Sequence, residues 1–74
     1  MQDINKEVGR RIRILRMNKG FSQEDLADYS GLHRSHMGEI ERGGCNITLK
    51  TLHRVGMALR VSVAELVKNV GREN

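Results

Sequence analysis

The stretch SQEDLADYSGLHRSHMGEIERG, residues 22–43, decides the fold of this chain. It contains two short helical segments joined by a turn so tight that particular positions accept only certain residue types. Ala27 is small enough to let the two helices approach, and Gly31, four residues later, supplies the positive φ angle that a sharp turn requires. The apolar residues that clamp the second helix in place are Leu26, Leu32, Met37 and Ile40. The pattern predicts a helix-turn-helix over about residues 23–42.

Apolar residues at helical spacing also occur on both sides of this motif. Before it, one stripe is formed by Ile4, Val8, Ile12 and Leu15. Asp3 is suited to cap the start of that helix. After the motif, Thr48 and Ser62 are suited to begin a fourth and a fifth helix, within about residues 48–70. The sequence therefore predicts five helices.

The composition favours a single all-α domain over residues 1–74. A chain of this size buries only about 60% of its unfolded surface, so its core must be small. It has no proline and no tryptophan, and only one tyrosine and one phenylalanine. Aliphatic residues on several short helices must therefore supply the core. We expect a compact five-helix bundle that contains the helix-turn-helix.

The charge and the cysteine content restrict the partners and the compartment. Thirteen lysines and arginines against nine acidic residues give a net charge of +4, which favours a polyanionic partner such as double-stranded DNA. Cys45 is the only cysteine, which excludes an intramolecular disulfide and favours a reducing compartment. No apolar run approaches the 18 or so residues of a membrane span. We expect a cytoplasmic protein without a membrane partner.

The second helix of the motif keeps several residues, most of them polar, outside its apolar stripe. They are Arg34, Ser35, Gly38 and Glu39, with His36 at the edge. An arginine can donate two hydrogen bonds to O6 and N7 of guanine, worth about 1 to 3 kcal/mol of discrimination. Glu39 either accepts a hydrogen bond from cytosine N4, or it acts against wrong sequences or bonds to neighbouring arginines, and both interpretations stay open. Gly38 either allows close approach to DNA or is a tolerated defect in the helix.

The stretch quoted above resembles the phage-repressor-like (Xre) helix-turn-helix family, and the resemblance extends over roughly residues 8–70. The short length and the run LHRSHMGEIERGGCNITLKTL are most similar to the controller proteins of restriction-modification systems. Three residues depart from the family pattern: His33 replaces the usual Ser, Thr or Asp cap, Ile47 the usual proline, and Cys45 a basic residue that can contact DNA. The resemblance implies a lambda-repressor-like domain that works, without a cofactor, as a homodimeric transcription regulator on a partly symmetric operator. RNA polymerase is a further candidate partner.

The resemblance also implies site residues, by position. Gln23 matches a glutamine that contacts a DNA phosphate from the positive end of a helix. The residues that match base-reading positions are Arg34, Ser35, His36 and Glu39. Further phosphate contacts are implied for His33, Arg42, Asn46, Lys50 and Thr51. Arg16 and Glu41 match a structural ion pair that fixes the first helix against the recognition helix, whereas the other arginines near Arg16 are expected on a solvated face.

The last helix has more apolar residues than one short helix needs to close a small core. We expect part of this surface to be covered by a second copy of the chain, related by a two-fold axis. The expected dimer contacts come from the fifth helix and the end of the fourth, and use some of Leu59, Val61, Val63, Leu66, Val67 and Val70.

Other functions have weaker support in the sequence. Zinc would need ligands from His33, His36, Cys45 and His53, whose spacing matches no standard finger or ribbon, so no metal is expected. No general base is identifiable beside Cys45, and there is no cofactor motif, which argues against an enzyme. The alternative to a transcription regulator is an antitoxin-type interaction module that also binds its own operator.

Overall fold

Five α-helices make up the part of the chain that the computed structural model describes, residues 3–72. The helices are α1 (Ile4–Asn18), α2 (Gln23–Ser30), α3 (Arg34–Arg42), α4 (Leu49–Leu59) and α5 (Val63–Val67). No strand occurs among these residues, and the predicted all-α five-helix fold is confirmed. The domain expected over residues 1–74 extends two residues beyond the described range at each end.

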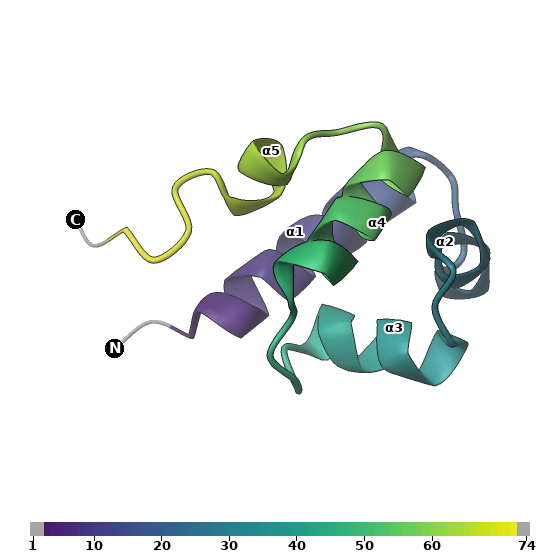
Figure 1. Ribbon diagram of the computed structural model, residues 1–74, viewed down its shortest axis with the longest axis horizontal. Coiled ribbons are helices and arrows are strands. Elements are labelled where there is room, and N and C mark those ends of the chain that lie inside the picture. The colour runs from purple at the N-terminus through teal and green to yellow at the C-terminus, as the bar shows by residue number, and fades with distance from the viewer. Residues whose placement is uncertain (1–2, 73–74) are drawn as a thin grey trace.

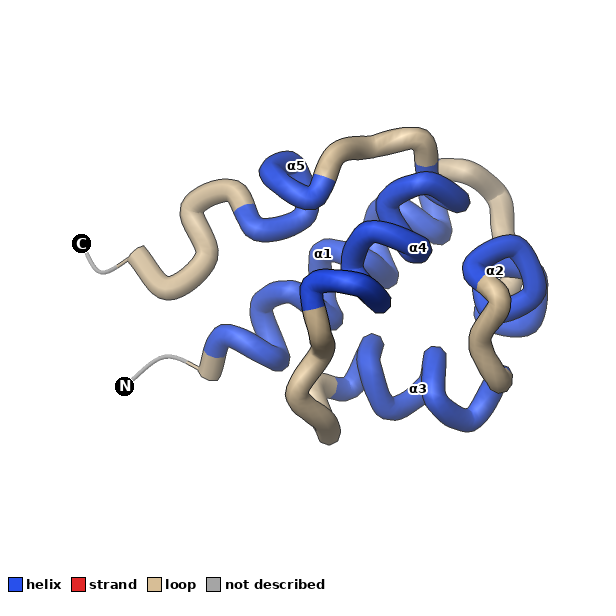
Figure 2. The backbone as a smooth tube through the Cα atoms, in the orientation of Figure 1, coloured by secondary structure: helices blue, strands red, loops and turns tan. Residues whose placement is uncertain are grey.

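The helices are arranged so that α3 and α5 lie on different sides of the bundle. Figure 1 shows α1 and α4 in the centre, with α3 along one side and α5 along the other. α3 packs against α1 and α2, whereas α5 packs against α4 and α1. In Figure 2 the short loop between α2 and α3 brings the two helices of the motif together at one end of the molecule. The outward face of α3 and the α5 region are therefore separate surfaces.

Side-chain caps define the starts of four helices, α1, α2, α4 and α5, as the sequence predicts. The carboxylate of Asp3 accepts hydrogen bonds from two backbone N–H groups in the first turn of α1, at 3.1 and 3.3 Å. Ser22 and Asp25 form a reciprocal capping box at the start of α2, with both bonds 2.9 Å long. The hydrogen bonds from Ser22, first its backbone N–H and then its side chain, lower the pKa of Asp25 below its ordinary value of 3.8. Thr48 and Ser62 cap α4 and α5 with one bond each, accepted from the backbone N–H groups of Thr51 and Glu65 at 3.1 and 3.0 Å.

α5 ends earlier than the apolar pattern indicates. The pattern continues to Val70, but the helix ends at Val67 because Lys68 adopts an extended conformation, with φ −56° and ψ 124°. Asn69 then takes a positive φ of 64°. Val70 still packs against the core, from a turn rather than from a helix. Apolar spacing reports burial here, and it does not report the backbone conformation.

All five helices contribute to one small core. Its buried apolar side chains are Val8, Ile12, Leu26, Ala27, Met37, Ile40, Leu52, Val55, Leu59 and Leu66. The turn of the motif has the two predicted features: Ala27 is buried between the helices, at 1% exposed, and Gly31 has a positive φ of 71°. The predicted helix-turn-helix is confirmed by α2, this turn and α3.

Gly9 lets α1 and α3 approach backbone to backbone. A Cβ atom at Gly9 would overlap the carbonyl oxygen of Ile40 and would lie 2.8 Å from the carbonyl oxygen of Glu41. A backbone cannot yield to such an atom as a flexible side chain would, so the two helices would have to separate. The glycine thus sets the distance of α3 from α1, a role that no local sequence pattern indicates.

Candidate nucleic-acid interface

α3 has one face locked into the bundle and one face open to solvent. Met37 is fully buried and Ile40 is 3% exposed, which fixes the helix on α1 and α2. Arg34, Ser35 and Glu39 are exposed on the other side. A rigid helix with an exposed polar face is the element that enters a DNA major groove in helix-turn-helix proteins.

Arg16 and Glu41 form the ion pair that the family resemblance implies. Nε of Arg16 lies 2.7 Å from Oε2 of Glu41, and Nη2 donates to Oε1 at 3.1 Å. The two side chains are 13% and 3% exposed, so the pair is nearly removed from solvent. Nη1 of Arg16 also donates to the carbonyl oxygen of Phe21, at 2.8 Å. The pair joins α1, α3 and the segment before α2.

Gln23 is held by the same carboxylate. It is the first residue of α2, and its Nε2 donates to Oε1 of Glu41 at 3.2 Å. The amide is half-buried rather than free in solvent. Since the amide nitrogen has two hydrogens, one bond to Glu41 leaves the second for an acceptor outside the protein. The structure therefore gives the predicted phosphate-contacting residue a fixed orientation.

Gly38 provides space for two polar side chains. A Cβ atom at Gly38 would lie 3.1 Å from Nη1 of Arg42 and 3.4 Å from Oε1 of Gln23. The glycine thus lies beside the side chains of two predicted phosphate contacts. A larger residue would be tight against the guanidinium of Arg42 and in ordinary contact with Gln23. Close approach to DNA and a tolerated defect in the helix both stay open as interpretations of this glycine.

The start of α3 is not capped by a side chain. His33 occupies the N-cap position but makes no capping hydrogen bond. The first turn of α3 contains no acidic residue either. The positive end of this helix therefore lacks a negative partner within α3 itself, which favours an anion there. His36, one of the predicted base-reading residues, is half-buried.

The residues predicted as a second phosphate clamp lie around the start of α4. Oδ1 of Asn46 accepts a hydrogen bond from Nδ2 of Asn5, at 2.9 Å. The hydroxyl groups of Thr48 and Thr51 are hydrogen-bonded to each other, at 3.0 Å. Lys50 is exposed beside them. Asn5, which ties this loop to α1, was missed because 41 residues separate it from its partner.

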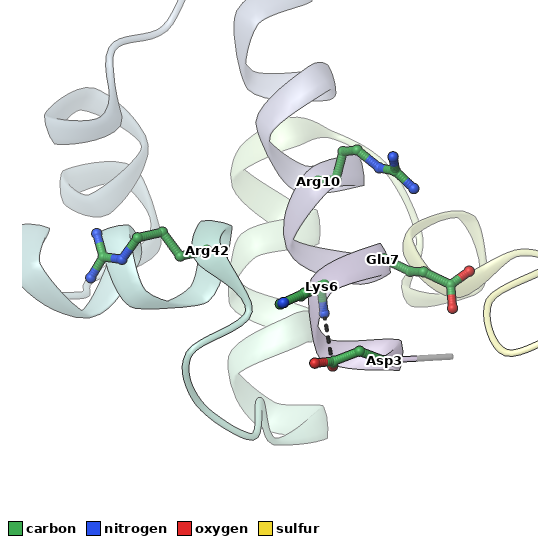
Figure 3. A pocket seen from close by; sticks show the side chains of 5 residues that line it. All are labelled: Asp3, Lys6, Glu7, Arg10 and Arg42. Carbon is green, nitrogen blue, oxygen red and sulfur yellow. Dashed lines mark hydrogen bonds between the residues drawn. The ribbon is translucent and has the colours of Figure 1, made fainter. Parts of the chain in front are cut away.

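A depression of about 570 Å³ lies near the start of α1. It is lined by Asp3, Lys6, Glu7, Arg10 and Arg42. Figure 3 shows that the guanidinium groups of Arg10 and Arg42 point away from each other, on different sides of α1. The carboxylate of Glu7 instead accepts a hydrogen bond from the backbone N–H of Gly71, at 3.3 Å. These charged groups do not converge on one point.

Two of the six residues predicted for a dimer interface belong to the core of a single chain. Leu59, the last residue of α4, and Leu66, in α5, are both 0% exposed. Their assignment to a dimer contact is wrong, because a side chain without accessible surface has none to bury against a partner. The apolar spacing could not separate residues that face the core from those that face outward. Val67 is 36% exposed, and Val61, Val63 and Val70 are half-buried.

Residues 3–72 contain neither a metal-binding cluster nor a membrane-spanning helix. No three histidine, cysteine, aspartate or glutamate side chains in this range gather closely enough to hold a metal ion. Cys45 is a half-buried free thiol that packs against the core. No helix in the same range has the length and apolar character needed to cross a membrane.

In this five-helix bundle, α2 and α3 form a tight helix-turn-helix, and α3 is packed on one face and exposes its polar residues on the other. This arrangement defines the lambda-repressor-like class of helix-turn-helix domain. Comparison with known families agrees with this class. The family model described as Helix-turn-helix matches residues 12–66. The chain belongs to this family, in its Xre-like branch.

Several relatives are similar over most of their length. Control protein C.SmaI from Serratia marcescens is 40% identical over 72 residues, which cover 97% of this chain and 86% of that protein. The crystal structure of the restriction-modification controller protein C.AhdI from Aeromonas hydrophila matches with a TM-score of 0.82 and 44% identity, over 84% of this chain and 94% of that one. The biofilm master regulator SinR, solved in complex with DNA, has 35% identity and a TM-score of 0.79, over 82% and 98% of the two chains.

Proposed function

We propose that the chain is a sequence-specific DNA-binding transcriptional regulator that places α3 in the major groove of its operator. The observation that carries this proposal is the fixed position of α3, whose buried face is anchored by Met37 and the pair of Arg16 and Glu41 while its polar face stays exposed. The similarity to controller proteins and to SinR, solved with DNA, supports the same conclusion.

The site residues divide into two groups in this proposal. The residues that read bases are Arg34, Ser35, His36 and Glu39. The residues that contact phosphates are Gln23, His33, Arg42, Asn46, Lys50 and Thr51. Phosphate contacts fix the register of the protein on the duplex, and contacts to base edges determine which sequence it prefers. The bonds that hold Gln23 and Asn46 support the phosphate-contacting roles, since they orient both side chains before DNA arrives.

The regulator acts as a homodimer in this proposal. A single recognition helix reads few base pairs, and two copies related by a two-fold axis place their helices about 34 to 36 Å apart, one turn of DNA. The surface proposed for the contact is formed by Val61, Val63, Val67 and Val70. Val67 is the most open of them, and all four lie at or near α5, on a different side of the bundle from α3.

The regulated genes proposed are those of a restriction-modification system, because controller proteins are among the relatives that the chain covers almost completely. The protein works in the cytoplasm by occupying an operator, and it either blocks RNA polymerase or recruits it. No chemical step is required for either outcome.

Selection of DNA from a random duplex pool, followed by footprinting, tests the proposed function. We expect a selected site with two related half-sites, separated centre to centre by one helical turn. Its affinity should fall steeply as salt rises, because each copy releases counterions from several phosphates. Recovery of no preferred sequence from the pool would overturn the proposal.

A further inference from the structure

The exposed face of the motif contains an ion pair between Arg34 and Glu24, and DNA binding as proposed above does not require this pair. Nη1 of Arg34 lies 3.6 Å from Oε2 of Glu24, and the two side chains are 70% and 66% exposed. Arg34 is the first residue of α3, and Glu24 lies in the first turn of α2. The pair therefore links the two helices of the motif at their starts.

The charges around the start of α3 explain why the carboxylate lies there. α3 begins without a capping side chain and without an acidic residue in its first turn, and Arg34 adds a positive charge to the positive end of the helix. Glu24 supplies from α2 the negative charge that α3 lacks. An acidic side chain is also favoured in the first turn of its own helix. The free protein thus has two reasons to keep Glu24 beside Arg34.

We propose that Glu24 is a specificity-determining residue, a role that rests on the proposed function and on Arg34 as a base-reading residue. In the free protein Glu24 holds the guanidinium of Arg34 and competes with DNA phosphates for it. Glu24 thereby lowers the affinity for DNA of unrelated sequence.

Guanine at the operator offers Arg34 a pair of hydrogen bonds. A phosphate on unrelated DNA does not offer the same geometry. O6 and N7 of guanine are two acceptors in one plane, and the planar guanidinium donates to both at once. This contact replaces the exposed pair at the operator. A mismatched base offers no such set of acceptors, so Arg34 stays with Glu24 there. Discrimination therefore increases through weaker binding to wrong sequences.

The exposure of the pair sets the size of the effect. Exposed ion pairs are weak, so loss of Glu24 should raise the affinity for random DNA by a factor of about two to five. The freed Arg34 then contacts a phosphate in the non-specific complex. One added phosphate contact for each bound chain steepens the dependence of log affinity on log salt by about 0.9.

The test compares Glu24→Gln with Asp28→Asn. Both substitutions remove one negative charge from α2 and nearly preserve the side-chain size, but Asp28 is exposed and makes no ion pair within residues 3–72. The probes are a duplex selected from a random pool by the wild-type protein and a scrambled duplex of equal length. Affinity for each is measured over a range of salt concentrations, and both variants are melted to check that they fold.

We expect Glu24→Gln to bind the scrambled duplex about two to five times more tightly than Asp28→Asn does. Its affinity for the scrambled duplex should also fall more steeply with salt. On the selected duplex, the difference in affinity between the two variants should be smaller. The added Arg34→Ala substitution should abolish this difference, because the two residues act on each other. Equal behaviour of the two single variants would overturn the role of Glu24, as would a difference that persists without Arg34. A wild-type protein that prefers no sequence would instead overturn the proposed function and this role together.

Discussion

Gln23 and Glu41 are joined by a hydrogen bond of 3.2 Å, from the side-chain amide of the first to the carboxylate of the second. Glu41 also accepts two bonds from Arg16, so one buried carboxylate both connects α1 to α3 and orients a predicted DNA contact. Substitutions at these positions should therefore separate effects on folding from effects on binding.

Glu41→Ala should lower the free energy of unfolding by about 3 to 5 kcal/mol, because it leaves the guanidinium of Arg16 buried without its partner. Thermal or urea denaturation measures this loss. Glu39→Ala is the matched control, since Glu39 is an exposed glutamate on the same helix and its removal should change stability little. Equal stability of Glu41→Ala and the wild-type protein would contradict the importance of the pair.

Arg34→Ala should weaken binding to the selected operator by about 1 to 3 kcal/mol and relax the preference at one base pair of each half-site. Gln23→Ala should weaken binding to all sequences by a similar factor, because a phosphate contact carries no sequence information. Competition between the selected duplex and random DNA distinguishes the two effects. The base-reading role is refuted when Arg34→Ala lowers both affinities equally.

Gly9→Ala should destabilise the protein although alanine favours a helix by about 1 kcal/mol relative to glycine. The added methyl group meets the backbone of α3, and such overpacking typically costs about 1 to 3 kcal/mol. The same substitution at Gly44 is the control, because its Cβ atom would make only an ordinary contact, 3.6 Å from the carbonyl oxygen of Glu39. A melting temperature of Gly9→Ala at or above that of the wild-type protein would show that the helices can separate without loss.

Val67→Glu should produce a folded monomer, because Val67 is 36% exposed in the single chain and lies in the surface proposed for the dimer. Sedimentation at micromolar concentration measures the oligomeric state, and circular dichroism shows whether the fold is kept. Met17→Glu alters another exposed apolar residue, outside that surface, and should leave the dimer intact. A wild-type protein that sediments as a monomer would exclude the dimer, and a dimeric Val67→Glu would place its interface elsewhere.

The sequence predicts features that depend on neighbouring residues in the chain. The capping box of Ser22 and Asp25 and the turn at Gly31 follow from short-range chemistry, and both have the predicted form in the structure. The pair of Arg16 and Glu41 was accessible only through the family resemblance, since 25 residues separate its members. Helical spacing identifies which apolar residues share one stripe of a helix.

Features that depend on the meeting of distant backbones were not predicted. A glycine inside a helix looks like a weak helix former, and only the crossing of α1 with α3 shows why Gly9 has no side chain. Leu59 and Leu66 have the same apolar character as Val67, and their burial depends on how α5 folds back over α4. The position of Glu24 beside Arg34 likewise depends on the angle between α2 and α3.

The contact at Gly9 also bears on how the operator geometry responds to mutation. Because the main chain of α3 rests on the main chain of α1 there, side-chain changes elsewhere in the core can loosen the bundle without altering the separation of these two helices. We expect such variants to lose thermal stability while α3 keeps its position relative to α1, and therefore its position on each half of the operator. The half-site that one chain covers is in this sense a property of the backbone.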